Sequence, residues 1–149
     1  MKYILAFILT VAAMSAMCQH ESGIFLTIKC AKGSPKQTVL GTSRQVCLAP
    51  SPIILPAEFT SVTDIRHARD RASFDLTMST KAIQMLMQLS SNLPKSSFAV
   101  VIDKEVYYVF PAGDLTVNRT FRFISSPKDD QVIVMMQRKI KAMLDARTQ

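Results

Sequence analysis

The chain has 149 residues, of which 48% are hydrophobic and 19% are charged, and its formal net charge is +7. This length suffices for one domain with a real core. The basic residues stand singly or in short groups, without interleaved aromatic residues, which argues against a nucleic-acid platform. Attraction to an acidic partner or to an anionic membrane stays open.

Residues 1–17 have the pattern of a secretory signal peptide. Lys2 is their only charged residue, Ile4–Val11 is almost wholly apolar, and a run of small residues leads to Met17. The apolar run is shorter than the roughly 20 residues that cross a bilayer. We therefore expect export to the periplasm or the cell surface, with residues 18–149 forming a single α+β domain.

Cys18 directly follows this segment and leaves two interpretations open. It could be the lipid-modified first residue of a lipoprotein, which would then contact a membrane, or a residue without a role in a freely exported chain. Met17 is not the small residue expected before a lipidation site, so the pattern favours export without a lipid.

The other two cysteines belong to the first predicted strands, Ile24–Cys30 and Arg44–Leu48. If these strands pair antiparallel around a turn at Lys32, Cys30 and Cys47 come opposite each other. An oxidising compartment would then favour a disulfide, and closing this loop would be worth about 3 kcal/mol. The alternative is two buried free thiols. No cysteine or histidine pair has the spacing of metal ligands, and no cofactor is expected.

The middle of the chain predicts a connector, a helix, a strand and a second helix. Three prolines make Pro50–Pro56 an extended connector. The capping-box pattern that begins at Ser61 predicts a short helix running to Arg69. Residues 74–78 alternate between apolar and polar and predict a strand, and Ser79 can cap a helix from Thr80 to about Ser91.

The last third of the chain predicts a hairpin, a strand and a helix. Phe98–Ile102 and Val106–Phe110 are rich in strand formers and flank three polar residues. A strand follows at Arg119–Ile124, and a final helix is expected to start near Ser126 and Pro127. Together these elements predict an α+β fold, with a mostly antiparallel sheet and helices packed mainly on one face.

The hairpin is also the predicted partner-binding surface. Because successive side chains of a strand point to opposite faces, one of its two consecutive tyrosines should face away from the core. Both hairpin faces are apolar, so the second face needs either a partner or the connector Pro50–Pro56 to cover it. The predicted contact residues are Tyr107, Tyr108 and Phe110, with a polar rim of Asp103, Lys104 and Glu105.

Catalytic chemistry has little support in the sequence. Its two histidines, His20 and His67, lie in an N-terminal lead and on the short predicted helix, and no known nucleophile or phosphate motif is present. The acid pair Asp129–Asp130 fits the first turn of a helix. We therefore expect a protein that is not an enzyme.

Four segments resemble the head subdomain of the first periplasmic domain of the SecD/SecF protein-export translocase. The segments are Val46–Ile54, Phe59–Ala68, Phe74–Ser79 and Phe98–Val106, and the resemblance covers residues 46–143. The sequence departs from that family at Lys104, where glycine is usual, and it lacks the translocase membrane helices.

The resemblance implies an α+β fold and an interaction role, not transport, because a head module alone has no channel to couple to. The expected function is that of an exported, non-catalytic accessory or adaptor module, with another exported or envelope protein as its partner. The alternative is a periplasmic immunity protein that blocks an exported toxin, and the third candidate is a small hydrolase.

Overall fold

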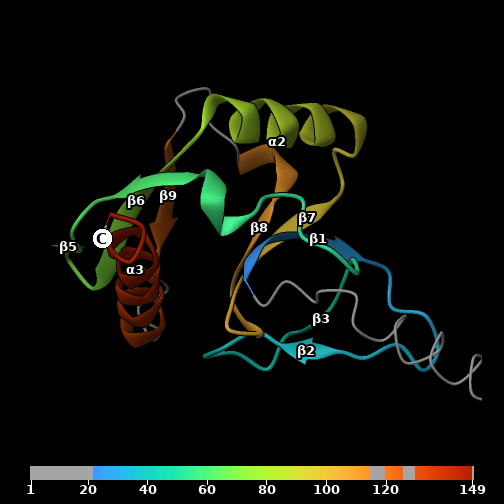
Figure 1. Ribbon diagram of the computed structural model, residues 1–149. Helices are drawn as coiled ribbons and strands as arrows, with labels where there is room; N and C mark the ends of the chain where they lie inside the picture. Colours follow the sequence, from blue (N-terminus) through green and yellow to red (C-terminus); the bar gives the residue numbers. More distant parts are fainter. Residues whose placement is uncertain (1–21, 115–119, 126–129, 149) are drawn as a thin grey trace, which may run out of the picture.

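The computed structural model describes residues 22–114, 120–125 and 130–148 (Figure 1). The predicted signal peptide, Cys18, His20 and the predicted helix start at Ser126 and Pro127 lie outside these residues. The strands are β1 (Gly23–Ile28), β2 (Gln37–Thr38), β3 (Gln45–Leu48), β4 (Phe59–Val62), β5 (Arg66–Ala68), β6 (Arg71–Met78), β7 (Ser97–Ile102), β8 (Glu105–Pro111) and β9 (Thr120–Ile124). The helices are α2 (Thr80–Asn92) and α3 (Asp130–Asp145), with the short 3-10 turns η1 (Pro56–Glu58) and η2 (Ala112–Asp114).

These strands form two sheets. The first has the order β2-β3-β1-β7-β8, and in the second β6 pairs with β4, β5 and β9. All of these strand pairs are antiparallel. The structure thus confirms a mixed fold of helices and antiparallel strands. The narrower expectation, helices mainly on one face of one sheet, is not confirmed, because the strands divide between two sheets.

The first sheet closes on itself. Val39, directly after β2, makes a parallel bridge to Val106 of β8, and the Leu40 amide donates to the Val106 carbonyl at 2.9 Å. The two ends of the sheet therefore meet, and a small apolar cluster fills the space inside. Its buried members are Phe25, Val39, Val46, Ala99, Val101 and Val106. Closure protects both edge strands from pairing with other chains.

The larger apolar cluster lies on the opposite face of the same strands. As the alternation predicts, Phe98, Val100 and Ile102 of β7 all point into it, while Ala99 and Val101 point into the small cluster. Both helices bury their apolar sides here, through Ala82, Ile83 and Leu86 of α2 and Ile133, Met136 and Ile140 of α3. Phe74, Leu76 and Met78 of β6 also belong to this cluster.

The helix predicted from Ser61 to Arg69 is wrong, because this segment forms β4 and β5. Val62 pairs with Leu76, and Arg66 pairs with Ser73, so the segment follows β6 as a strand with a break in the middle. The Thr63 hydroxyl, read as part of a capping pattern, instead accepts from the Asp75 amide at 2.9 Å. Long-range pairing with β6 has overridden a local helix-start signal.

Other local signals are confirmed. Ser79 has extended backbone angles, and its hydroxyl accepts from the Ala82 amide at 3.1 Å, which caps α2 as expected. The connector runs beside β1, where the Ile24 amide donates to the Ile54 carbonyl at 2.9 Å. Gly23 is required at this contact, because a Cβ atom there would lie 2.5 Å from that carbonyl oxygen.

The two strand cysteines lie together. In the antiparallel pairing of β1 with β3, Ile28 is opposite Cys47, and Cys30 and Cys47 form a disulfide with their Cα atoms 5.3 Å apart. This bond is compatible with an oxidising compartment outside the cytosol. Within the described residues, no helix is long and apolar enough to cross a membrane.

Candidate functional site

The predicted contact residues of the hairpin do not share one environment. Tyr107 and Phe110 are 2% and 1% exposed and belong to the larger core cluster. Tyr108 is half-buried, and its hydroxyl lies 3.4 Å from the Ile124 carbonyl, to which it donates. Burial raises the pKa of both tyrosines above the ordinary value, so both hydroxyls stay protonated at neutral pH.

A β-bulge explains how two consecutive tyrosines both pack toward the same core. Val100 pairs with Tyr108 and Val101 pairs with Val106, so Tyr107 is an extra residue without an opposite partner in β7. The extra residue turns both tyrosines toward the larger cluster. The expectation that one tyrosine faces away is therefore wrong, because strict alternation does not hold across a bulge.

The second apolar face of the hairpin is also accounted for. It lies inside the closed first sheet, against Phe25, Val39 and Val46. The connector faces the other way, with Ile54 in the larger cluster. The closing strands, rather than a partner or the connector, therefore cover this face.

The polar rim at the hairpin turn contacts α3. Lys139 donates from Nζ to Asp103 at 2.8 Å and lies 3.6 Å from Glu105 and over the Tyr107 ring. The bond to Asp103 raises the pKa of Lys139, so the ammonium remains charged. Asp103 and Lys104 both have positive φ angles, 51° and 69°, which gives the tight hairpin turn without glycine. Asp103 and Glu105 are thus engaged within the protein.

A cavity of about 270 Å³ opens beside Tyr108. Apolar side chains from the segment after β2, from β8 and from α3 line it, with Thr42 and Arg44 as its polar members. The Thr42 hydroxyl is used locally, since it donates to the Val39 carbonyl at 3.0 Å and accepts from the Arg44 amide at 3.0 Å. The lining is therefore mostly apolar, with the Arg44 guanidinium as its charged group.

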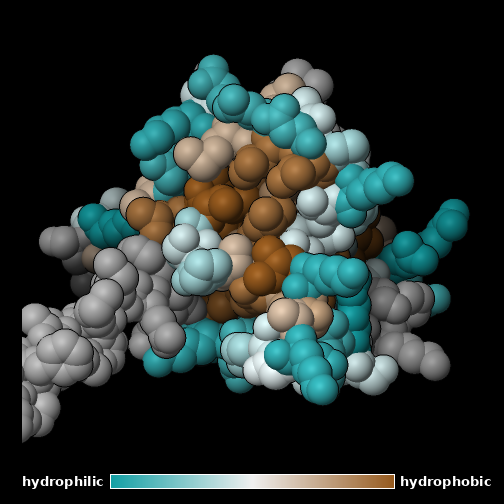
Figure 2. All heavy atoms as spheres, turned by 90° about the vertical axis from the view of Figure 1, so that its right-hand side faces the viewer, coloured by the Kyte–Doolittle hydropathy of each residue, from teal (hydrophilic) through white to brown (hydrophobic). Residues whose placement is uncertain are grey.

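A second hollow of about 270 Å³ lies between the connector and α2. Its lining is mostly apolar and comes from Ser51–Leu55 on one side and from α2 on the other, with Glu58 and Lys81 as charged members. Leu55 and Met85 line it and are 38% and 37% exposed. Figure 2 shows apolar side chains gathered on the side of the molecule to which α2 and β1 extend. We call this hollow the connector groove.

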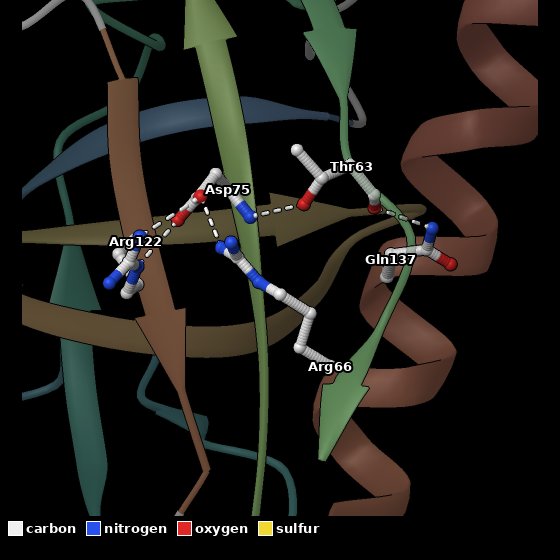
Figure 3. Close-up of polar contacts among 5 residues, drawn as sticks. All are labelled: Thr63, Arg66, Asp75, Arg122 and Gln137. Atoms are coloured by element: carbon white, nitrogen blue, oxygen red, sulfur yellow. Dashed lines mark hydrogen bonds and ion pairs between the residues drawn. The ribbon is translucent and has the colours of Figure 1, made fainter. Parts of the chain in front are cut away.

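The third feature is a buried carboxylate held by two arginines (Figure 3). Asp75 points to the polar face of β6, and its side chain is 11% exposed. Arg122 donates to it from Nε at 2.7 Å and from Nη2 at 3.2 Å, and Arg66 donates from Nη2. These bonds, chiefly the one from Arg122, lower the pKa of Asp75, so the carboxylate is ionised at neutral pH.

Sequence reasoning missed this arginine cluster. The alternation of residues 74–78 places Asp75 on the polar face of a strand, and that signal was available. Arg66, however, was assigned to a helix, and no local pattern connects Arg122 to a residue 47 positions earlier. Only the pairing of β6 with β5 and β9 brings the three together.

Of the residues considered for catalysis, His67 and Asp130 are described, whereas His20 and Asp129 lie outside the described residues. His67 lies on β5 and is exposed, near enough to Asp130 for its charge to help lower the pKa of that carboxyl. The main cause is the Ser125 hydroxyl, which donates to Asp130 and also accepts from the Ala72 amide at 2.9 Å. Ser125 is 3% exposed, so its hydroxyl is not presented to a substrate. Among the described residues, no histidine, cysteine and acidic side chains gather as a metal site.

In comparisons with protein-family models, with curated proteins and with solved structures, nothing matches this chain. These comparisons therefore leave the resemblance to the translocase head subdomain as an expectation from the sequence. Within that resemblance, the segment Phe59–Ala68 includes most of the helix predicted from Ser61 and contains β4 and β5 instead.

Proposed function

We propose that this protein is an exported, non-catalytic module that binds another exported or envelope protein as an accessory or adaptor. The proposal is carried by the connector groove, where large apolar side chains stay exposed next to a hollow. Apolar side chains that gather around a hollow with charged residues at its edge favour protein contacts.

Two features make the groove suited to a partner side chain. Met85 is unbranched and adapts its shape to what it contacts. The opposite wall contains Pro52, whose ring fixes the backbone φ angle there and reduces the entropy lost on binding. Glu58 and Lys81 supply charges of both signs at the lining.

The hairpin remains a second part of the proposed binding surface, in a reduced form. Tyr108, half-buried beside its cavity, is the aromatic residue of this region that a partner could still reach, and the turn residues 103–105 are exposed. Tyr107 and Phe110 are buried in the core and do not belong to this surface.

The experiment is a comparison of two methionines on one helix. The full chain is expressed with a tag and used to capture its partner from a periplasmic extract. The captured partner is then identified and purified. We expect Met85→Glu to weaken binding of the purified partner at least tenfold. Met87→Glu is the matched control, because Met87 is 40% exposed on the same helix and does not line the groove. Equal binding by the wild type and both variants would contradict the proposed groove.

The alternative function, an immunity protein, makes a different prediction for cells. The protein should then bind one partner tightly, and that partner should be encoded by a neighbouring gene and be toxic outside the cytosol. Co-expression of this protein should protect cells from the toxic partner. An adaptor would bind without protecting. Turnover of a substrate in a hydrolase panel by the purified chain would favour the third candidate and contradict the non-catalytic proposal.

A further inference from the structure

We infer that Arg66 and Arg122 form a binding site for a carboxylate on an acidic segment of a partner protein. The two side chains lie on the polar face of the second sheet, on either side of Asp75 (Figure 3). This inference rests on the proposed function, protein binding, but concerns a face that the connector groove does not include.

The charge balance of the cluster supports the inference. Arg122 lies directly opposite Asp75 in the pairing of β6 with β9, and its two bonds already neutralise the carboxylate. Arg66, opposite Ser73, adds a second positive charge to the same single acid. One arginine is enough to neutralise the Asp75 carboxylate across the strands. The second arginine therefore leaves a net positive charge on this cluster.

Both guanidinium groups are positioned and still accessible. Asp75 is buried and fixes their orientation, while the Arg66 and Arg122 side chains are 51% and 59% exposed. A guanidinium has five N–H donors, and the bonds to Asp75 use one from Arg66 and two from Arg122. Donors in this planar geometry match the two oxygens of a carboxylate.

A protein carboxylate is favoured over a membrane surface. Lipid-binding faces gather clusters of about four to eight basic residues. Here the two arginines on Asp75 are accompanied by Arg69 and Arg71 at the β5–β6 turn, which also contains the acidic Asp70. One or two acidic side chains of a partner would balance such a small excess. The positive net charge of the chain would assist their approach.

The test uses the full chain and a fluorescent hexaglutamate peptide at low salt, with binding followed by anisotropy. We expect Arg66→Gln to weaken binding about threefold to tenfold. Arg138→Gln removes the same charge from an exposed position on α3 and should change binding less than twofold. In NMR spectra, the peptide should shift the Nε–H signals of Arg66 and Arg122 and leave that of Arg138 in place.

Three outcomes would overturn the inference. Equal losses in Arg66→Gln and Arg138→Gln would mean attraction to net charge alone. Unshifted Arg66 and Arg122 signals would mean that the peptide binds elsewhere. Binding to phosphatidylglycerol vesicles through Arg66, without peptide binding, would assign the face to a membrane. The residues that line the connector groove include none of the arginine cluster. Met85→Glu should therefore leave peptide binding unchanged, so that each of the two sites is tested independently of the other.

Discussion

At the scale of single residues, Asp75 is a charged group that the fold buries. Its carboxylate is buried on the polar face of β6, and a buried charge is stable only when it is paired and hydrogen-bonded. Arg66 and Arg122 meet this requirement, and the Asp75 backbone amide separately donates to the Thr63 hydroxyl. The same three contacts connect strands β5, β6 and β9 and the segment that follows β4.

We expect Asp75→Asn to lower the free energy of unfolding by about 1–3 kcal/mol at pH 7, because it removes hydrogen bonds between charged groups. The pKa of Asp75 is lowered in the folded state. Its stabilisation is therefore present above the unfolded pKa, about 3.9, and is lost as the pH falls through the lower folded value. Urea denaturation at pH 7 and at about pH 2.5 measures both effects.

Asp64→Asn is the control for this comparison. Asp64 is 88% exposed and pairs with Lys141 at 3.1 Å, so its loss should cost less than about 1 kcal/mol. If the difference between wild type and Asp75→Asn persisted unchanged at acid pH, the carboxylate would not be the source of the stability.

At the scale of elements, the bulge in the hairpin decides which residues are core and which are surface. With Tyr107 as the extra residue, Tyr107 becomes nearly inaccessible, whereas its neighbour Tyr108 stays half-buried beside a cavity. Bulges turn side chains in this way because the ladder is interrupted locally and the strand bends.

We expect Tyr107→Ala to destabilise the protein by about 3–5 kcal/mol, as for other large buried aromatic residues. Tyr108→Ala should cost less than half as much, because a half-buried ring leaves a smaller cavity. Urea denaturation followed by circular dichroism compares the two. Equal losses would mean that both rings are core, and they would remove Tyr108 from the proposed binding surface.

At the scale of the whole molecule, two apolar clusters share the strands of one closed sheet. The larger receives both helices and the second sheet, while the smaller is enclosed by the first sheet itself. The disulfide between Cys30 and Cys47 joins the segment directly after β1 to β3.

Reduction of this disulfide should lower the stability of the whole molecule. Its cysteines are 17 residues apart, and closing a loop of this size stabilises the folded state by about 3 kcal/mol in the chain-entropy model. We expect dithiothreitol to shift the urea midpoint of the wild type downward. A Cys30→Ser, Cys47→Ser double variant is the control and should not respond to the reductant. A wild type that did not respond either would show that the bond contributes nothing.

The sequence by itself determined the elements whose signals are local. Alternation in residues 74–78 gave β6, the Ser79 cap gave the start of α2, and two runs of strand formers around a polar turn gave the hairpin. These patterns succeed because period-2 and period-3.6 spacing, caps and turns act over a few residues.

Only the tertiary structure decided which distant segments meet. Residues 59–68 became strands because β6 offers pairing along its length, and the bridge from Val39 to Val106 closed the first sheet. The Arg66–Asp75–Arg122 cluster and the connector groove likewise depend on pairing and packing across many intervening residues. A local pattern contains no information on such contacts, because their free energy arises only when the partners are brought together in the folded chain.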